Sequence, residues 1–173
     1  NKLIISFDLN KTSFIEVINY IENIDPEDSQ YINSKKLEIP VCCDENFSMD
    51  IKRLEEILKL SREKILEKFL NKEYFCYMTG FIAGMPFLGD LDKNMRVQRL
   101  ETPRVKVPKG SVAITEQFAN IYTFESPGGW NILGNTPLDV FDSSKEDKPN
   151  LINPGDTVIF KEITIEQYKN FNE

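Results

Sequence analysis

The sequence predicts an α+β fold, in which a small N-terminal α/β domain in residues 1–72 precedes a β-rich domain in residues 73–173. Two observations predict this division. Apolar residues recur at helical spacing in three segments before residue 72, whereas short apolar runs alternate with Gly and Pro turns after it. With 173 residues, 40% of them hydrophobic, the chain is long enough to bury a substantial core.

The first segment predicts a strand followed by a helix. Residues 3–7 form a short apolar run that is typical of a strand. Ser13 and Glu16 have the spacing of a capping box, and Phe14 opens a stripe of apolar residues at helical spacing. We therefore expect a helix after Ser13 that ends before residues 25–29, where a proline and polar residues begin a loop.

Two further helices are expected after extended structure in residues 37–42. Ile51 and Leu54 begin the apolar stripe of the first helix, with Asp50 as its cap, and Ser61 caps the second. The short link between them predicts a helix–turn–helix hairpin. Such hairpins are common in plain packing and the net charge of −7 opposes DNA, so we expect no nucleic-acid partner.

Beyond residue 72 the sequence predicts a barrel or a sandwich of short strands. Strand-like runs occupy residues 74–78, 112–114, 120–124, 130–133, 138–141 and 157–160, with Gly or Pro turns between most of them. Residues 142–150 are polar and predict a surface loop.

The composition excludes several kinds of chemistry. The chain has no histidine, which excludes Ser–His and Cys–His nucleophile activation and His-bearing metal sites. Its three cysteines have no C-x-x-C spacing, which fits a reducing cytoplasm and predicts no metal site, and Cys76 lies in an apolar run that predicts a buried thiol. No apolar stretch is long enough for a bilayer and no secretory signal opens the sequence, so we expect a soluble, cytoplasmic protein without a membrane partner.

Two groups of residues could bind an anion. Residues 109–111 combine a lysine, a flexible glycine and a serine, which suit a phosphate but are also common in a simple turn. Arg96, Arg99 and Arg104 lie close together in the sequence and could recognise a carboxylate or a phosphate, or could simply be exposed. Trp130 follows two glycines and could border a pocket or fill a barrel.

Several motifs identify a known family. Residues 80–89 have the sequence GFIAGMPFLG, residues 107–114 have VPKGSVAI and residues 126–137 have SPGGWNILGNTP, with IPVC at 39–42 and PGD at 154–156. In this order they resemble the family of the 5-oxoprolinase B subunit, also called allophanate hydrolase subunit 1. This family includes the sporulation-kinase inhibitor KipI and corresponds to subdomains C and D of a carboxyltransferase domain.

The resemblance implies a fold and an activity. It implies a small α/β domain followed by a cyclophilin-like β-barrel, with the family's first strand and helix missing ahead of this chain. The implied activity is the ATP-dependent opening of 5-oxo-L-proline to L-glutamate by a 5-oxoprolinase complex that also contains a sister C subunit (KipA-like) and an A subunit. ATP is expected at the level of the complex, and biotin is not expected because no Met-Lys-Met carrier motif is present.

We expect a barrel pocket that holds a small amide or carboxylate substrate. In it, glycines let backbone N–H groups approach the anion, Arg104 or Lys109 supplies charge, and Trp130 excludes water. No catalytic residue is assigned. The candidate binding residues are Gly84, Pro86, Gly89, Arg104, Lys109, Gly110, Ser111, Tyr122, Ser126, Gly128, Gly129 and Trp130.

The chain departs from the family at several polar positions. Phe69 stands where the family usually has a histidine, and residues 115–123 lack two glycines, a glutamine and a proline of the family pattern. These departures motivate an alternative function, in which the chain is a KipI-like regulatory protein that binds and inhibits a histidine kinase without catalysis of its own.

Overall fold

A computed structural model of the protein describes residues 5–24 and 34–171, and it divides the chain into two compact units, residues 1–32 and 33–173. The first unit contains helix α1 (Phe14–Glu22), which begins with the capping box predicted from the sequence. Most of its apolar residues are exposed, Phe14 by 65% and Ile15 by 69%. The strand expected in residues 3–7 lies partly outside the described residues, and its described part, residues 5–7, is not a strand. The loop expected in residues 25–29 lies outside them.

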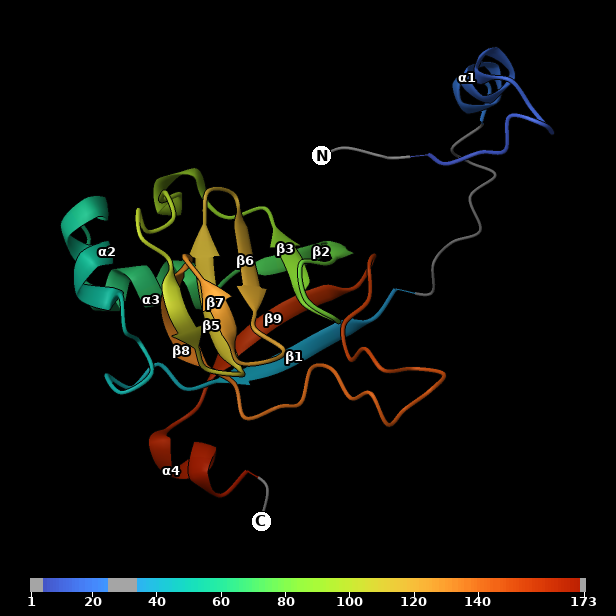
Figure 1. The fold of residues 1–173 in the computed structure, drawn as a ribbon. Helices are drawn as coiled ribbons and strands as arrows, with labels where there is room; N and C mark the ends of the chain where they lie inside the picture. Colours follow the sequence, from blue (N-terminus) through green and yellow to red (C-terminus); the bar gives the residue numbers. More distant parts are fainter. Residues whose placement is uncertain (1–4, 25–33, 172–173) are drawn as a thin grey trace. The chain divides into compact units, whose positions relative to one another are not determined.

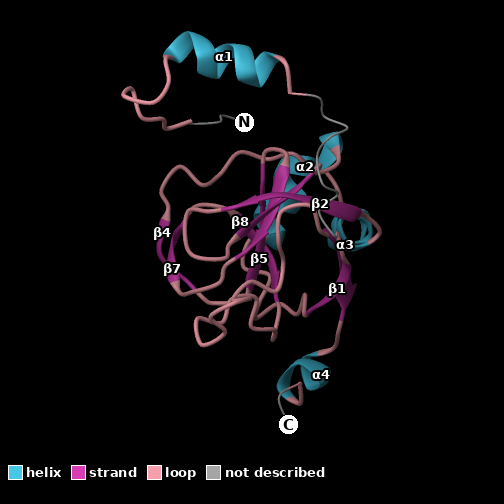
Figure 2. Cartoon of the chain, turned by 90° about the vertical axis from the view of Figure 1, so that its right-hand side faces the viewer, coloured by secondary structure: helices cyan, strands magenta, loops and turns pink. Residues whose placement is uncertain are grey.

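The second unit is built on a seven-stranded sheet with the order β1-β9-β2-β3-β6-β5-β8, and strands β4 and β7 form a separate two-stranded ribbon (Figure 1, Figure 2). β1 and β9 are parallel, and the other pairs are antiparallel. The strands are β1 Lys36–Val41, β2 Glu73–Thr79, β3 Pro86–Gly89, β4 Arg104–Val107, β5 Ser111–Thr115, β6 Phe118–Ile121, β7 Ser126–Gly128, β8 Asn131–Asn135 and β9 Thr157–Glu162.

The sheet curls until the ends of its two outer strands, β1 and β8, meet at an isolated bridge. Cys42, directly after β1, exchanges two backbone hydrogen bonds with Asn135 at the end of β8, with N···O distances of 2.8 and 3.0 Å. Gly134 permits this approach, because a Cβ at its position would lie 2.7 Å from the Cys42 carbonyl oxygen. The result is a curled half-barrel, and the predicted α+β class is confirmed.

Helices α2 (Ile51–Leu58), α3 (Arg62–Leu70) and α4 (Ile165–Lys169) and a short 3₁₀ helix η2 (Lys93–Met95) complete this unit. Ser61 caps α3 as predicted, by accepting a hydrogen bond from the Lys64 N–H. Asp50 occupies the N-cap position of α2 as predicted, but its side chain makes no capping hydrogen bond and binds Arg104 and the Ile132 N–H instead. Residues 138–141 also differ from the prediction, since only an isolated bridge between Phe141 and Asn150 forms there.

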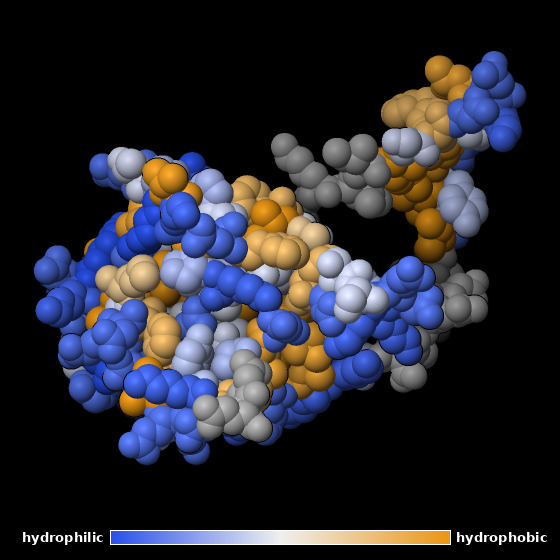
Figure 3. Space-filling model, turned by 60° about the horizontal axis from the view of Figure 1, so that its bottom comes forward, coloured by the Kyte–Doolittle hydropathy of each residue, from blue (hydrophilic) through white to orange (hydrophobic). Residues whose placement is uncertain are grey.

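The core of the second unit consists of two clusters of buried side chains. The larger one joins α2 and α3 to the sheet, with Phe69 stacked on Phe160 at a centroid distance of 4.8 Å. The smaller one contains Met85, Val107, Ala113, Tyr122 and Ile132, and Trp130 packs against it. On the face of the second unit shown in Figure 3, hydrophobic residues lie in patches among hydrophilic ones.

The boundary predicted near residue 72 lies between α3 and β2, inside the second unit. The two-domain division itself stays a prediction. No helix in the described ranges is both long and apolar enough to cross a membrane.

Candidate functional site

A pocket of about 340 Å³ opens between the turn before β3, the segment before β4 and the connection from β7 to β8. We call it the Arg99 pocket, after its charged residue. It is lined by Phe81, Met85, Phe87, Arg99, Pro103, Tyr122, Pro127, Gly128, Gly129 and Trp130.

The walls of the Arg99 pocket are mostly aromatic. The rings of Phe87 and Trp130 meet edge to face, with centroids 5.6 Å apart and planes at 79°. Phe81 is 75% exposed and has a φ of 70°, a left-handed conformation that few non-glycine residues adopt. Met85 and Tyr122 are buried and connect the pocket to the smaller core cluster.

The Tyr122 hydroxyl is held against the backbone of Gly128. A Cβ at Gly128 would collide with this hydroxyl, so a glycine is required where the phenol approaches β7. Burial raises the pKa of Tyr122, although hydrogen bonds from the Trp130 backbone and the Asn120 side chain act in the opposite direction. The hydroxyl is therefore protonated at neutral pH.

Arg99 carries the charge of this pocket. Its side chain is exposed, and within the described part of the chain it forms no ion pair. The pocket lining contains no carboxylate, thiol or amine side chain. The site therefore offers one guanidinium, one neutral phenol and apolar walls to a ligand.

Arg104 is used in a different way. Its Nη2 donates to Asp50 Oδ1 at 2.5 Å, and Asp50 Oδ2 accepts a second hydrogen bond from the Ile132 N–H at 2.7 Å. The Asp50 side chain is 6% exposed and that of Arg104 27%. This pair links β4 to the start of α2 and to β8, so the charge of Arg104 is neutralised by a buried partner.

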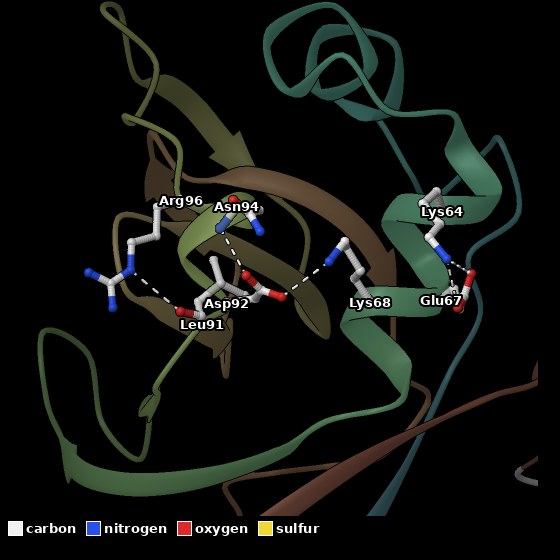
Figure 4. Close-up of polar contacts among 7 residues, drawn as sticks. All are labelled: Lys64, Glu67, Lys68, Leu91, Asp92, Asn94 and Arg96. Atoms are coloured by element: carbon white, nitrogen blue, oxygen red, sulfur yellow. Dashed lines mark hydrogen bonds and ion pairs between the residues drawn. The ribbon is translucent and has the colours of Figure 1, made fainter.

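Arg96, the third arginine of the cluster, does not line the Arg99 pocket. Its Nε donates to the Leu91 carbonyl oxygen at 3.4 Å (Figure 4). Nearby, Asp92 accepts hydrogen bonds from the Asn94 N–H and from Lys68 Nζ, which lower the pKa of its carboxyl below the ordinary value (Figure 4). The bond to Lys68 ties η2 to α3.

Lys109 and Gly110 lie at a separate hollow of about 280 Å³, which Thr136, Asp139 and Lys169 also line. Lys109 Nζ is 2.6 Å from Asp139 Oδ1, so its charge is already paired. Gly110 has a φ of 81°, and its carbonyl accepts from the Thr136 N–H. The two stretches that the sequence suggested for an anion are thus at different places.

The other predicted residues occupy structural positions. Gly84 has a φ of 69° and packs on Phe141, and Gly89 lies against the Tyr77 ring. Pro86 is buried at the start of β3, Ser111 is buried in β5, and Ser126 begins β7.

Four of the twelve predicted residues line the Arg99 pocket, namely Tyr122, Gly128, Gly129 and Trp130. Whether they bind a substrate stays a prediction. The sequence analysis missed the apolar lining residues, because an isolated Phe, Met or Pro in a sequence carries no signal that distinguishes a pocket wall from a core. It named Arg99 only as a member of a cluster, and it gave no sign of Asp50 as the partner of Arg104.

The cysteines take no part in this pocket. All three are buried free thiols, which confirms the prediction for Cys76. Burial raises the pKa of Cys43 and of Cys76 to about 12, so both thiols are neutral under ordinary conditions. Among residues 5–24 and 34–171, no group of three or more Cys, Asp or Glu side chains is arranged to hold a metal ion.

Comparisons with known proteins agree with this fold. Residues 1–152 match the family model described as carboxyltransferase domain, subdomain C and D. The chain is 37% identical over 142 residues to the 5-oxoprolinase B subunit of Bacillus subtilis, a match that covers 82% of this chain and 59% of that protein. It therefore spans about three fifths of the length of that relative.

Solved structures show the same arrangement. A conserved uncharacterized protein from Pyrococcus horikoshii matches with a TM-score of 0.72 and 36% identity, over 94% of this chain and 74% of that one. The Kluyveromyces lactis urea carboxylase matches with a TM-score of 0.76 over 90% of this chain and 16% of its own, at 20% identity, which is a likeness of fold. Since the family model covers most of the sequence, the chain belongs to the family of the carboxyltransferase domain, subdomain C and D, whose relatives include the B subunit of 5-oxoprolinase.

Proposed function

We propose that this chain is a non-autonomous subunit of an ATP-dependent amide hydrolase of the 5-oxoprolinase type, which opens 5-oxo-L-proline to L-glutamate. Family membership supports a subunit of such a complex, and one observation carries the substrate assignment. The Arg99 pocket is small, has apolar walls and holds one guanidinium that is not engaged in a described ion pair, which suits a small cyclic amide with a carboxylate.

The lining of this pocket supports a function that depends on partner subunits. Opening an amide ring requires a nucleophile at the carbonyl carbon and a proton for the departing nitrogen. Besides Arg99, Tyr122 is the titratable side chain of the lining, and because its pKa is raised it stays protonated at neutral pH and does not act as a base. We therefore assign binding and orientation of the ring to this chain, and the reacting groups to a sister C subunit with a related barrel and to an A subunit.

ATP is placed at the level of the complex. The Arg99 pocket offers a triphosphate a single cation, and the Lys109 hollow contains a lysine that is already paired with Asp139. Neither of these two hollows fits a triphosphate, so we assign no step at either of them to ATP. A cytoplasmic location stays a prediction.

Reconstitution tests this function. The chain, mixed with the A and C subunits of a related 5-oxoprolinase, is expected to restore ATP-dependent glutamate formation from 5-oxo-L-proline, and each mixture that lacks one component is expected to be inactive. Glutamate is measured with and without ATP. A mixture of all three components that assembles and forms no glutamate would contradict the proposal.

The regulatory alternative is supported by the same lack of reacting groups and by the exposed Phe81 at the pocket. Affinity purification distinguishes the two functions. Recovery of a barrel-containing sister protein supports the hydrolase, whereas recovery of a histidine kinase whose autophosphorylation the chain inhibits supports the regulator.

A further inference from the structure

We propose that Arg99 is the specificity-determining residue of the pocket, and that it selects small cyclic carboxylates, with the carboxylate on the guanidinium and the ring against the aromatic walls. The inference rests on the proposed function in that it names the ligand class of the same pocket. It adds to that function the single residue of the arginine cluster that recognises the carboxylate, which the comparisons do not name.

The backbone around Arg99 is fixed before any ligand arrives. The Leu100 N–H donates to the Gly129 carbonyl at 2.6 Å, which joins this segment to the turn on the other side of the pocket. The Val97 carbonyl accepts from the Glu116 N–H at 2.6 Å, and the Gln98 carbonyl accepts from Asn131 Nδ2 at 3.1 Å. A side chain that recognises a ligand is most effective when its backbone is held in this way.

The charge of the pocket favours a monoanion. Arg99 is the one charged residue of the lining, and no carboxylate lines the pocket to repel an anion. A guanidinium presents a planar pair of donors that matches both oxygens of a carboxylate. Of the neighbouring arginines, Arg104 is paired with Asp50 and Arg96 donates to Leu91, so neither replaces Arg99.

The walls favour a flat, compact ring. The volume of about 340 Å³ is at the lower end for ligand pockets, and Phe87 and Trp130 form an aromatic corner beside it. The Tyr122 hydroxyl already receives hydrogen bonds from the Trp130 backbone and the Asn120 side chain, so its own O–H remains as a donor for the carbonyl oxygen of the ring. A lactam that carries a carboxylate satisfies all three features, whereas a neutral lactam leaves the guanidinium without a partner.

Two ligands that differ only in the carboxylate test the inference. Isothermal titration of the full chain is done with 5-oxo-L-proline and with 2-pyrrolidinone, the same ring without its carboxylate. We expect 5-oxo-L-proline to bind at least about tenfold more tightly, because a charge-assisted hydrogen-bond pair is lost with the carboxylate. Higher salt is expected to weaken the first ligand and to leave the second unchanged.

Substitution of the arginine separates its charge from the shape of the pocket. Arg99→Gln is expected to reduce 5-oxo-L-proline affinity to that of 2-pyrrolidinone without changing the affinity for 2-pyrrolidinone. Arg96→Gln, a matched loss of one nearby guanidinium outside the pocket, is expected to change neither affinity. Because Arg99 is exposed and unpaired in the described structure, its variant is expected to keep the wild-type urea midpoint.

Three results would each overturn the inference. They are equal binding of both rings by the wild type, unchanged 5-oxo-L-proline binding by Arg99→Gln, and no binding of 5-oxo-L-proline at 10 mM. This concentration is roughly an order of magnitude above common KM values. The outcome is separable from the proposed function. Arg99-dependent binding by a chain that supports no turnover in the reconstituted complex leaves the selectivity intact and removes the hydrolase assignment. Turnover that is insensitive to Arg99→Gln leaves the hydrolase assignment intact and removes the selectivity.

Discussion

Two adjacent glycines in the wall of the Arg99 pocket are not equivalent. A Cβ at Gly128 would collide with the Tyr122 hydroxyl, whereas a Cβ at Gly129 would meet Pro103 and the Leu100 carbonyl at 3.6 Å, an ordinary contact. Gly128 allows the phenol to reach the backbone of β7, whereas the position of Gly129 has space for a side-chain methyl group. Sequence alone shows two glycines in succession and does not distinguish them.

Substitution of each glycine by alanine tests this difference. We expect Gly128→Ala to displace the Tyr122 ring, to lower the free energy of unfolding by about 1–3 kcal/mol and to weaken 5-oxo-L-proline binding, since overpacking a filled site forces neighbours to move. Gly129→Ala is expected to keep the wild-type stability. Urea unfolding followed by fluorescence measures the stability of both variants. Equal effects of the two substitutions would show that the close approach of the Tyr122 hydroxyl to Gly128 is unimportant.

At the scale of secondary-structure elements, one buried ion pair holds three of them together. Asp50 precedes α2, Arg104 begins β4, and Ile132 belongs to β8, and all three meet at the Asp50 carboxylate. β4 pairs with β7, which carries Gly128, so the pair also fixes the ribbon that forms one wall of the pocket. The Asp50–Arg104 pair is therefore a positioning feature rather than a binding group.

Removal of the carboxylate is expected to be costly. Asp50→Ala leaves the Arg104 guanidinium partly buried without its partner and the Ile132 N–H without an acceptor, a loss of about 3–5 kcal/mol in unfolding free energy. Glu125→Ala removes one partner of the exposed pair with Lys106 and serves as the control, with a much smaller effect. An equal decrease in the urea midpoints of the two variants would refute the structural role of the buried pair.

The elements themselves were predictable to different degrees. The three helices before residue 72 follow from apolar spacing and capping residues, and each of them forms. The short strands β4 and β7 were not expected. β4 has four residues and includes a lysine, β7 has three and includes a proline, and segments this short carry no strand pattern. They exist because they pair with each other, Arg104 with Gly128 and Val107 with Ser126, a long-range effect that no local pattern reports.

At the scale of the whole second unit, burial of ionisable groups links the fold to pH. Cys43, Cys76 and Tyr74 all lie in the larger core cluster, and burial is the main cause of the raised pKa of each. The pKa of each of the two thiols rises from an ordinary 9.0 to about 12 on folding. Their contribution to the stability of the folded state is therefore fully present below pH 9 and is lost between pH 9 and 12.

Stability is therefore expected to fall as the solution becomes alkaline. Each of the two thiols is expected to cost about 1 kcal/mol of unfolding free energy between pH 8 and pH 10, because the unfolded chain loses its protons while the folded chain keeps them. Urea midpoints at pH 7, 8, 9 and 10 measure the effect, and Cys76→Ala is expected to flatten the slope. A midpoint that is the same at pH 8 and pH 10 would contradict it.

Local spacing and short contiguous motifs were sufficient to predict the α+β class, the three helices, most of the glycine- and proline-bounded strands and the family. They did not show which arginine lines the pocket and which is paired with Asp50, nor that Lys109 and Tyr122 lie at different hollows, and these points required the folded chain. The physical reason is that a side chain's partners are set by which strands the curled sheet brings together. Asp50 and Arg104 are 54 residues apart in the chain, and only the fold places them within hydrogen-bond distance.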